Sequence, residues 1–131
     1  MMRWTETTLK YKHKYMKTMK EFLKKERKKT MMILTKAIKE KLIANHKAQD
    51  GTKSFKAELK LFNPTGIGTW YLSELNPENN NAFGLCCLTE EEFGYVNLDE
   101  LLSFKGQMGL GIERDKFFKP KSLEECQNEK N

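Results

Sequence analysis

The chain has 131 residues, a length that suits one domain and excludes two independent cores. It contains 24 Lys and Arg against 18 Asp and Glu, which gives a net charge of +6. No stretch approaches the roughly 20 apolar residues of a membrane-spanning helix, and the three cysteines lack the pattern of a disulfide framework or a metal site. We therefore expect a soluble cytoplasmic protein with reduced thiols, without a bound metal or cofactor.

The positive charge is concentrated in residues 1–30, which hold 11 Lys and Arg against 3 Glu, whereas residues 31–131 hold 13 Lys and Arg against 15 acids. Apolar residues recur every three to four positions from Tyr15 to Leu23, as in an amphipathic helix. Such a basic helix can bind nucleic acid, an anionic membrane or a partner, or remain a solvated extension. The candidate nucleic-acid-binding residues are Lys10, Lys12, Lys14, Lys17, Lys20, Lys24, Lys25, Arg27, Lys28 and Lys29.

A helix is predicted over residues 31–45, where Leu34, Ile38 and Leu42 recur on one face. Thr35 can cap its start, because its hydroxyl can accept from a backbone N–H one turn further on. The polar residues that follow, up to Gly51, are predicted to form a loop. His46 is the lone histidine of this loop and has no ligand spacing around it, so we expect a solvated side chain.

A meander of three strands is predicted next. Residues 55–61 alternate apolar side chains with Lys and Glu, which is typical of a strand with one wet face. The turn residues of 63–66 end this strand, and residues 67–75 return as its antiparallel partner. After the polar run 76–81, the apolar residues 82–88 predict a third strand near the middle of the sheet.

The last third of the chain predicts a short strand, a helix and a final strand. Glu90–Glu92 reads as a solvated turn before a strand at Tyr95 and Val96. Asn97 then has the position of a helix N-cap, with Glu100 three residues on, and Lys105–Gly106 is predicted to end this helix. Its apolar residues Leu98, Leu101, Leu102 and Phe104 are predicted to form the buried side of the helix.

Residues 109–111 are predicted to turn the chain into a last strand over 112–118, from which Ile112 and either Phe117 or Phe118 would pack back on the sheet. We expect the polar residues from Ser122 onward to hold one loose helical turn. The predicted fold class is α+β, with an antiparallel sheet of about three to five strands, one or two helices and a basic helical extension. The predicted parts are a helical or disordered extension over 1–30, a domain over 31–123 and a polar tail over 124–131.

Several segments between about Met31 and Leu123 occur in a characteristic order: Leu34–Lys36, Thr69–Tyr71, Phe83–Leu85, Gly94–Leu101 and Gly109–Asp115, followed by Phe117 and Pro120. In these segments the chain resembles a family of small single-domain proteins of unknown function, carried on bacterial plasmids, conjugative elements and phages. The resemblance implies a bacterial or phage-infected host cell, and no chemistry, because the family has no established activity. Residues 1–30 lie outside it, so translation could start at Met1 or at Met31 or Met32, and Gly111 stands where a proline is expected.

Two groups of residues are candidates for a site. Glu113, Arg114 and Asp115 form the densest charged cluster, with the two carboxylates on one face of an extended segment and Arg114 on the other. The carboxylates of Glu113 and Asp115 could share a proton or hold a cation. Alternatively, Arg114 could bridge to the sheet or to Glu74. The aromatic residues Trp70, Tyr71 and Tyr95 could form an interaction surface on which bases stack, or could pack in the core together with Phe83.

Three functional hypotheses follow. The family resemblance, together with the absence of catalytic and phosphate-binding motifs, favours a non-enzymatic accessory protein of a mobile element that binds a protein partner. The basic residues 1–30 favour nucleic-acid binding, and the cluster at 113–115 would serve an enzyme. Cys86 and Cys87 lie in an apolar strand, where a buried thiol is ordinarily inert. The sequence leaves the oligomeric state open.

Overall fold

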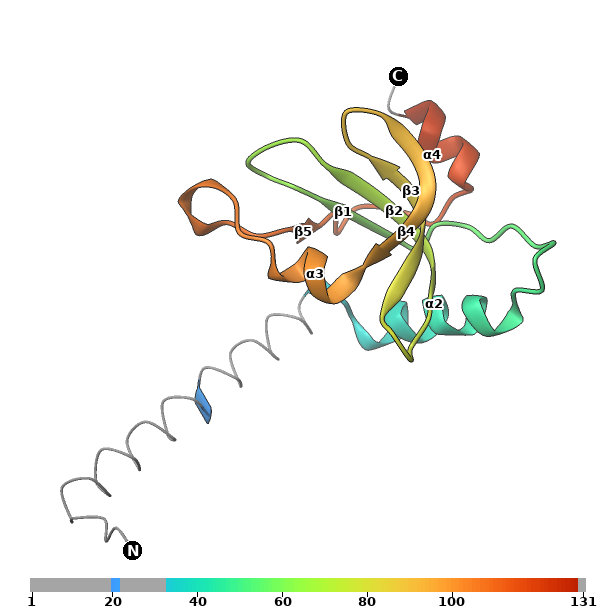
Figure 1. Cartoon of the computed structure of the whole chain (residues 1–131). Helices are drawn as coiled ribbons and strands as arrows, with labels where there is room; N and C mark the ends of the chain where they lie inside the picture. The colour runs from blue at the N-terminus through green and yellow to red at the C-terminus, as the bar shows by residue number, and fades with distance from the viewer. Residues whose placement is uncertain (1–19, 22–32, 130–131) are drawn as a thin grey trace, which may run out of the picture. The chain divides into compact units, whose positions relative to one another are not determined.

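The computed structural model describes residues 20–21 and 33–129, and residues 34–129 belong to one compact unit (Figure 1). Residues 1–33 belong to a separate unit, in which Lys20 and Glu21 are helical and exposed. The rest of the basic segment lies outside the described residues. This includes both methionines at 31–32 and all the candidate nucleic-acid-binding side chains except Lys20.

The compact unit contains a five-stranded antiparallel sheet with the order β4-β3-β2-β1-β5. The prediction of an α+β fold is therefore confirmed, with three α-helices among the described residues of this unit. In chain order the elements are α2 (Lys36–Ala48), β1 (Leu59–Phe62), β2 (Thr69–Leu75), β3 (Asn81–Cys87), β4 (Glu91–Asn97), α3 (Leu98–Ser103), the 3-10 turn η1 (Gln107–Gly109), β5 (Glu113–Arg114) and α4 (Leu123–Glu129).

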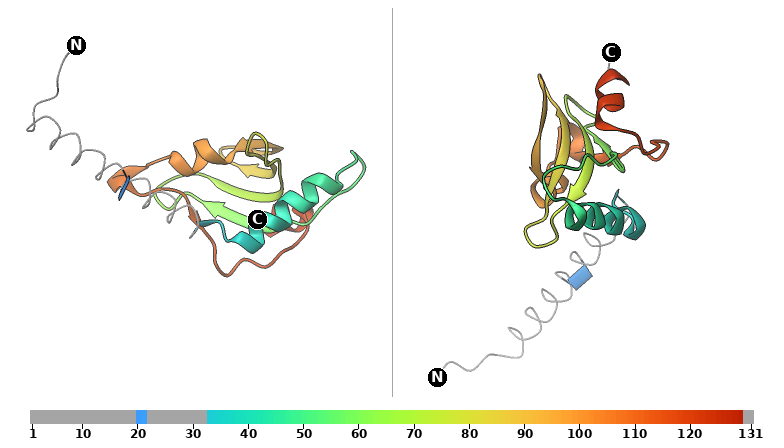
Figure 2. Two further views of the ribbon diagram at one scale, coloured as in Figure 1. Left: turned by 90° about the horizontal axis from the view of Figure 1, so that it is seen from below. Right: turned by 90° about the vertical axis from the view of Figure 1, so that its right-hand side faces the viewer.

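The central strand β2 is buried along both of its faces. The pairing registers place Leu59, Leu61 and Leu72 on one face of the sheet. The opposite face, which we call the Tyr71 face, is covered in part by α4, and the right-hand view of Figure 2 shows α4 apart from α2. The core cluster on the Tyr71 face consists of Ala57, Tyr71, Leu85, Cys87, Leu123 and Cys126.

The helix α2 is held at its start and near its end. The predicted cap is confirmed, since the Ile38 N–H donates to Thr35 Oγ1 at 3.2 Å. The predicted end at Asn45 is wrong, because the Asn45 side chain donates to the buried carbonyl of Ser73 at 3.0 Å and the helix continues to Ala48. The sequence is mostly polar here, and the contact of α2 with β2 accounts for the longer helix. His46 lies in this helix rather than in a loop.

The helix α3 follows β4 directly. Its predicted N-cap is confirmed, since the Glu100 N–H donates to Asn97 Oδ1 at 3.1 Å. Leu98 and Leu101 are buried as predicted, whereas Phe104 is partly exposed. The prediction that Lys105–Gly106 ends the helix is wrong, because the helix already ends at Ser103 and Gly106 has an extended backbone.

The strand lengths differ from the prediction at both edges of the sheet. Glu91 and Glu92 lie in the seven-residue strand β4, not in a turn, because each has a register partner in β3. The last strand β5 has two residues rather than seven. The segment from Ser122 forms the packed helix α4 rather than one loose turn, because Leu123 and Cys126 are buried on the Tyr71 face.

Candidate functional site

A β-bulge in β2 decides where the side chain of Glu74 points. Leu72 pairs with Gly84 and Glu74 pairs with Phe83, so two steps along β2 match one step along β3. Side chains alternate along a strand, so without the bulge Glu74 would share a face with Leu72. The bulge instead places Glu74 beside Phe83 on the Tyr71 face, and re-aiming a side chain is a common role of such bulges.

Glu74 is a buried carboxylate with one hydrogen bond and no cationic partner in the described part of the chain. The residue is 7% exposed, and its Oε2 accepts from Gln49 Nε2 at 3.1 Å. None of the ion pairs among residues 33–129 involves Glu74. Burying a charged carboxylate costs several kcal/mol unless an opposite charge or good hydrogen bonds compensate it. The Glu74 carboxylate can therefore accept a hydrogen bond from a further donor.

Glu74 lines a cleft of about 510 Å³ on the Tyr71 face, which we call the Glu74 cleft. Loop residues 53–55 and residues 122–124 at the start of α4 also line it. Its size is that of a small-molecule or side-chain pocket, which is commonly about 300–1,000 Å³. The aromatic lining comes from Phe55, Phe83 and Phe93, and the polar lining from Lys53, Ser54, Ser73, Ser122 and Glu124. This combination suits a ligand with a charged head and an apolar stem.

Residues 33–124 match the family model described as a protein of unknown function (DUF2958). The chain belongs to this family. The predicted membership of a family of unknown function is thereby confirmed, and every residue that lines the Glu74 cleft lies within the matched DUF2958 region. No curated protein and no solved structure matches the chain.

The three aromatic interaction candidates lie in different environments within the DUF2958 domain. Trp70 and Tyr71 are buried, at 7% and 4% exposure, and the Tyr71 ring lies 5.9 Å from the ring of Phe118. Tyr95 on β4 is 75% exposed and its ring centroid lies 5.2 Å from that of Phe83. Of the three, Tyr95 alone presents its ring to solvent.

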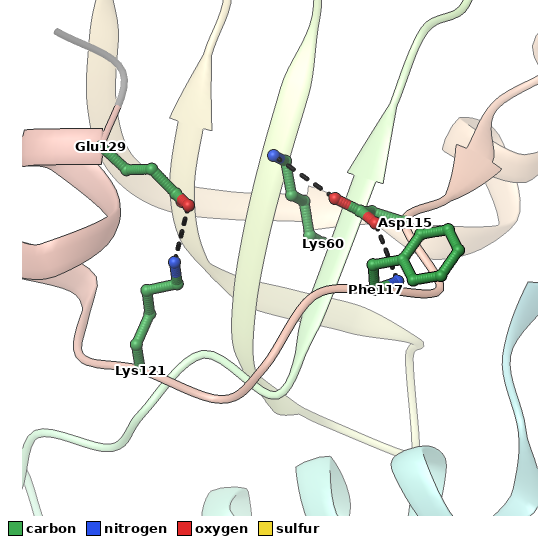
Figure 3. Close-up of polar contacts among 5 residues, drawn as sticks. All are labelled: Lys60, Asp115, Phe117, Lys121 and Glu129. Carbon is green, nitrogen blue, oxygen red and sulfur yellow. Dashed lines mark hydrogen bonds and ion pairs between the residues drawn. The ribbon is translucent and has the colours of Figure 1, made fainter.

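The charged cluster at 113–115 lies at the β5 edge of the sheet, away from the Glu74 cleft. Asp115 is held in place, because its carboxylate lies 3.6 Å from Lys60 Nζ and accepts from the Phe117 N–H at 2.9 Å (Figure 3). Glu113 is exposed beside Phe62 in the register. These contacts give Asp115 a structural role in joining β5 to β1.

Arg114 does not form the bridge that the sequence suggested. It pairs with Leu61 in the register, on the face opposite that of Glu74. Its Nε is buried and has no hydrogen-bond partner among the described residues, and Glu74 bonds Gln49 instead. Glu113, Arg114 and Asp115 do line a shallow hollow together with Lys60 and Phe117. Substituting Glu113→Gln and Asp115→Asn remains the test of the enzyme hypothesis.

The cysteines of the DUF2958 domain lie in or beside its core. Burial raises the pKa of the Cys86 thiol, and it raises the pKa of Cys126 to about 11. A thiol with a raised pKa carries little thiolate near neutral pH, so Cys86 and Cys126 are poor nucleophiles.

No group of His, Cys, Asp or Glu within residues 33–129 is arranged to hold a metal ion. Within the same described part of the chain, no helix has the length and apolar content that crossing a bilayer requires.

The place of Glu74 in the cleft could not be predicted from the sequence, which suggests this residue only as a bridging partner for Arg114. The available signal was a single glutamate, at position 74, within the otherwise uncharged strand sequence Thr69–Leu75. A charged residue in a strand that is buried on both faces marks either a pairing partner or a site. The face of the sheet to which the Glu74 side chain points could not be predicted, because no residue around Ser73 is characteristic of a β-bulge.

Proposed function

We propose that this DUF2958 protein is a non-enzymatic interaction protein whose Glu74 cleft receives a cationic side chain of a protein partner. The observation that supports this most is the buried Glu74 carboxylate, which lines an open cleft and has no ion pair among the described residues. A partner's ammonium or guanidinium group would provide the ion-pair partner that Glu74 lacks, since Lys53 lines the same cleft but forms no ion pair with it among the described residues.

The walls of the cleft favour lysine or arginine over an inorganic cation. Both side chains carry an apolar stem below the charged head, and such stems pack against apolar surface. Phe55, Phe83 and Phe93 supply that surface, and an aromatic ring face also attracts a cation directly. We infer that the partner presents a basic segment. The mobile-element context belongs to the same proposal and is supported by the sequence resemblance described above.

Two small probes that differ only in charge test this proposal. We expect N-acetyl-arginine methylamide to shift the backbone NMR signals of Phe83 and Phe93 at millimolar concentrations. The neutral citrulline analogue should bind at least about tenfold more weakly, because leaving one partner of a buried charge pair unmatched costs several kcal/mol. Glu74→Gln should abolish the difference between the probes.

Glu78→Gln is the matched control, because Glu78 is an exposed glutamate outside the cleft. It should leave the affinity for the arginine probe unchanged. Equal binding of both probes, or full arginine binding by Glu74→Gln, would contradict the proposal.

The second candidate function is nucleic-acid binding through residues 1–30, supported by their 11 Lys and Arg against 3 Glu. Phosphate contacts make such binding fall steeply with salt. We expect fluorescence anisotropy with single- and double-stranded DNA to show salt-sensitive binding by the full chain. Replacing Lys24, Lys25, Lys28 and Lys29 with Gln should weaken it. Salt-independent binding, or binding unaffected by these substitutions, would contradict this candidate.

A further inference from the structure

The strand β4 forms an open edge of the sheet. It pairs with β3 on one side, and no described strand pairs with its other side. An edge strand presents unpaired backbone N–H and C=O groups, which can pair with another chain. Proteins usually blunt such edges with lysines, prolines or short strands. The seven residues Glu91–Asn97 contain neither lysine nor proline, and their two charged residues, Glu91 and Glu92, lie together at one end, so the edge from Phe93 to Asn97 lacks the usual protection.

The side chains of β4 are arranged about Gly94. Phe93 and Tyr95 flank it, point to the Tyr71 face and are 51% and 75% exposed. Gly94 itself has ample space, because a Cβ built there would meet no atom within 4 Å, and its backbone is not left-handed. Nothing within one copy therefore requires glycine at this position. A glycine in a strand often marks a place where another backbone approaches closely.

We propose that two copies of this chain pair through their β4 strands, antiparallel and centred on Gly94, to form one continuous ten-stranded sheet. A two-fold axis perpendicular to the sheet keeps the Tyr71 faces of both copies on the same side. Paired residues must then share a face, and with Gly94 at the centre each Phe93 lies opposite the Tyr95 of the second copy. The pair contains two aromatic cross-strand contacts, which stabilise antiparallel sheets.

The charges and the aromatic rings favour this register over pairs centred on Glu92 or on Tyr95. With Gly94 at the centre, Glu92 lies opposite Val96 and Glu91 opposite Asn97, so no like charges face one another. A pair centred on Glu92 would place two glutamates opposite each other, which is destabilising. A pair centred on Tyr95 would match Phe93 with the polar Asn97. In the Gly94 register the aromatic side chains therefore lie opposite one another, and no glutamate lies opposite another glutamate.

This pairing has a consequence for the Glu74 cleft. Phe93 lines the cleft, and both clefts would open on the same side of the joined sheet. Apart from Phe93, the residues that pair lie outside the cleft, and the pairing requires no ligand at Glu74, so it does not depend on the function proposed for Glu74. Two clefts on one surface would let a dimer bind two basic segments of one partner at once, which raises the effective affinity.

Sedimentation equilibrium of the full-length chain over a range of concentrations tests the pairing. We expect the average mass to rise towards that of a dimer. Tyr95→Lys should raise the dissociation constant by about tenfold or more, because it removes both aromatic contacts and adds charge to the edge. Phe117→Lys is the matched control, since Phe117 is 93% exposed and lies outside β4, and it should dimerise like the unaltered chain. A monomer at every concentration, or a Tyr95→Lys dimer of unaltered strength, would overturn the proposal.

A cysteine crosslink tests the register. Directly opposite residues of an antiparallel pair have Cα atoms roughly 4.5–5.5 Å apart, within the range that a disulfide spans. We expect Gly94→Cys to form a covalent dimer under mild oxidation, whereas Glu78→Cys and the unaltered chain should not. Crosslinking of Gly94→Cys no faster than that of Glu78→Cys would overturn the Gly94-centred register.

Discussion

The two edges of the sheet are built in opposite ways. At one edge, β5 has two residues, and Asp115 directly after it pairs with Lys60 and caps the Phe117 N–H. At the other edge, β4 has seven residues and exposes two aromatic rings, Phe93 and Tyr95. A short, charged edge discourages pairing with other chains, and a long aromatic edge permits it. The β5 edge is thus short and tied to β1, whereas the β4 edge leaves two aromatic rings accessible, as the proposed pairing of two copies requires.

The strongest test of this comparison uses the register partners Gly84 and Gly94. A Cβ at Gly84 would lie 1.9 Å from the backbone oxygen of Tyr71, next to the bulge, whereas a Cβ at Gly94 would meet nothing within 4 Å. We expect Gly84→Ala to destabilise the fold by about 1–3 kcal/mol or more. Gly94→Ala should be neutral or stabilise it by up to about 1 kcal/mol. Urea unfolding monitored by circular dichroism measures both.

An equal loss of stability in the two glycine variants would show that the strand beside the bulge and the open edge tolerate an added side chain equally well. It would also remove the argument that space at Gly94 is unused within one copy.

The next test compares the helix caps that follow the two edges. Asn97 ends β4, accepts from the Glu100 N–H and also donates to Asn79 and Asn81. Ser122, which follows β5, accepts from the Glu125 N–H at 3.1 Å. Cap losses typically cost about 1 kcal/mol, and we expect Asn97→Ala to cost more than Ser122→Ala because it loses additional bonds. Thermal unfolding of both variants checks the order, and a larger loss for Ser122→Ala would contradict it.

A smaller effect is expected from the ion pair at the β5 edge. Lys60 and Asp115 are partly exposed, so their coupling should amount to less than about 1 kcal/mol. A double-mutant cycle with Lys60→Gln and Asp115→Asn measures this coupling. Salt should weaken it further because the pair is accessible to solvent. A coupling that is large and independent of salt would mean that the β5 edge is held by charge rather than by its backbone pairing.

The last prediction concerns the part of the Tyr71 face that α4 covers, between the two edges. Its effect on the free energy of unfolding is expected to be the smallest at neutral pH. Burial raises the pKa of Cys126 from 9.0 to about 11 and that of Tyr71 from 10.0 to about 12. Between pH 9 and 11 the unfolded chain therefore loses the Cys126 proton first, and stability falls as the pH rises. The Cys126→Ala variant should lack the part of this fall in stability that comes from the Cys126 thiol. An unchanged pH dependence in denaturant titrations would contradict this assignment.

The elements that the sequence predicts well are those specified by local chemistry. Thr35 and Asn97 occupy the cap positions that their side chains favour, and the alternation of Ala57, Leu59 and Leu61 marks the buried side of β1 and the segment before it. These features depend on residues within a few positions of each other. Short-range patterns of this kind carry enough information to place strands and helix starts.

The features that the sequence did not predict depend on contacts between distant segments. Asn45 continues α2 because it reaches the carbonyl of Ser73, and Glu91 lies in a strand because β3 provides a partner. The candidate site has the same origin, since a one-residue bulge directs Glu74 and nothing in the residues around it announces a bulge. Sequence reasoning therefore finds the framework of the domain and misses the geometry of its cleft.

The place of β5 and α4 in the chain has a consequence for folding kinetics. The strands β1 to β4 follow one another through short connections, whereas β5 pairs with β1 across a long interval of sequence, and α4 comes after it. Local hairpins form early and long-range closures form late. Ser122, Leu123 and Glu124, which complete the Glu74 cleft, therefore arrive in the last step. A ligand of the cleft should then slow unfolding of the native protein and leave the folding rate unchanged.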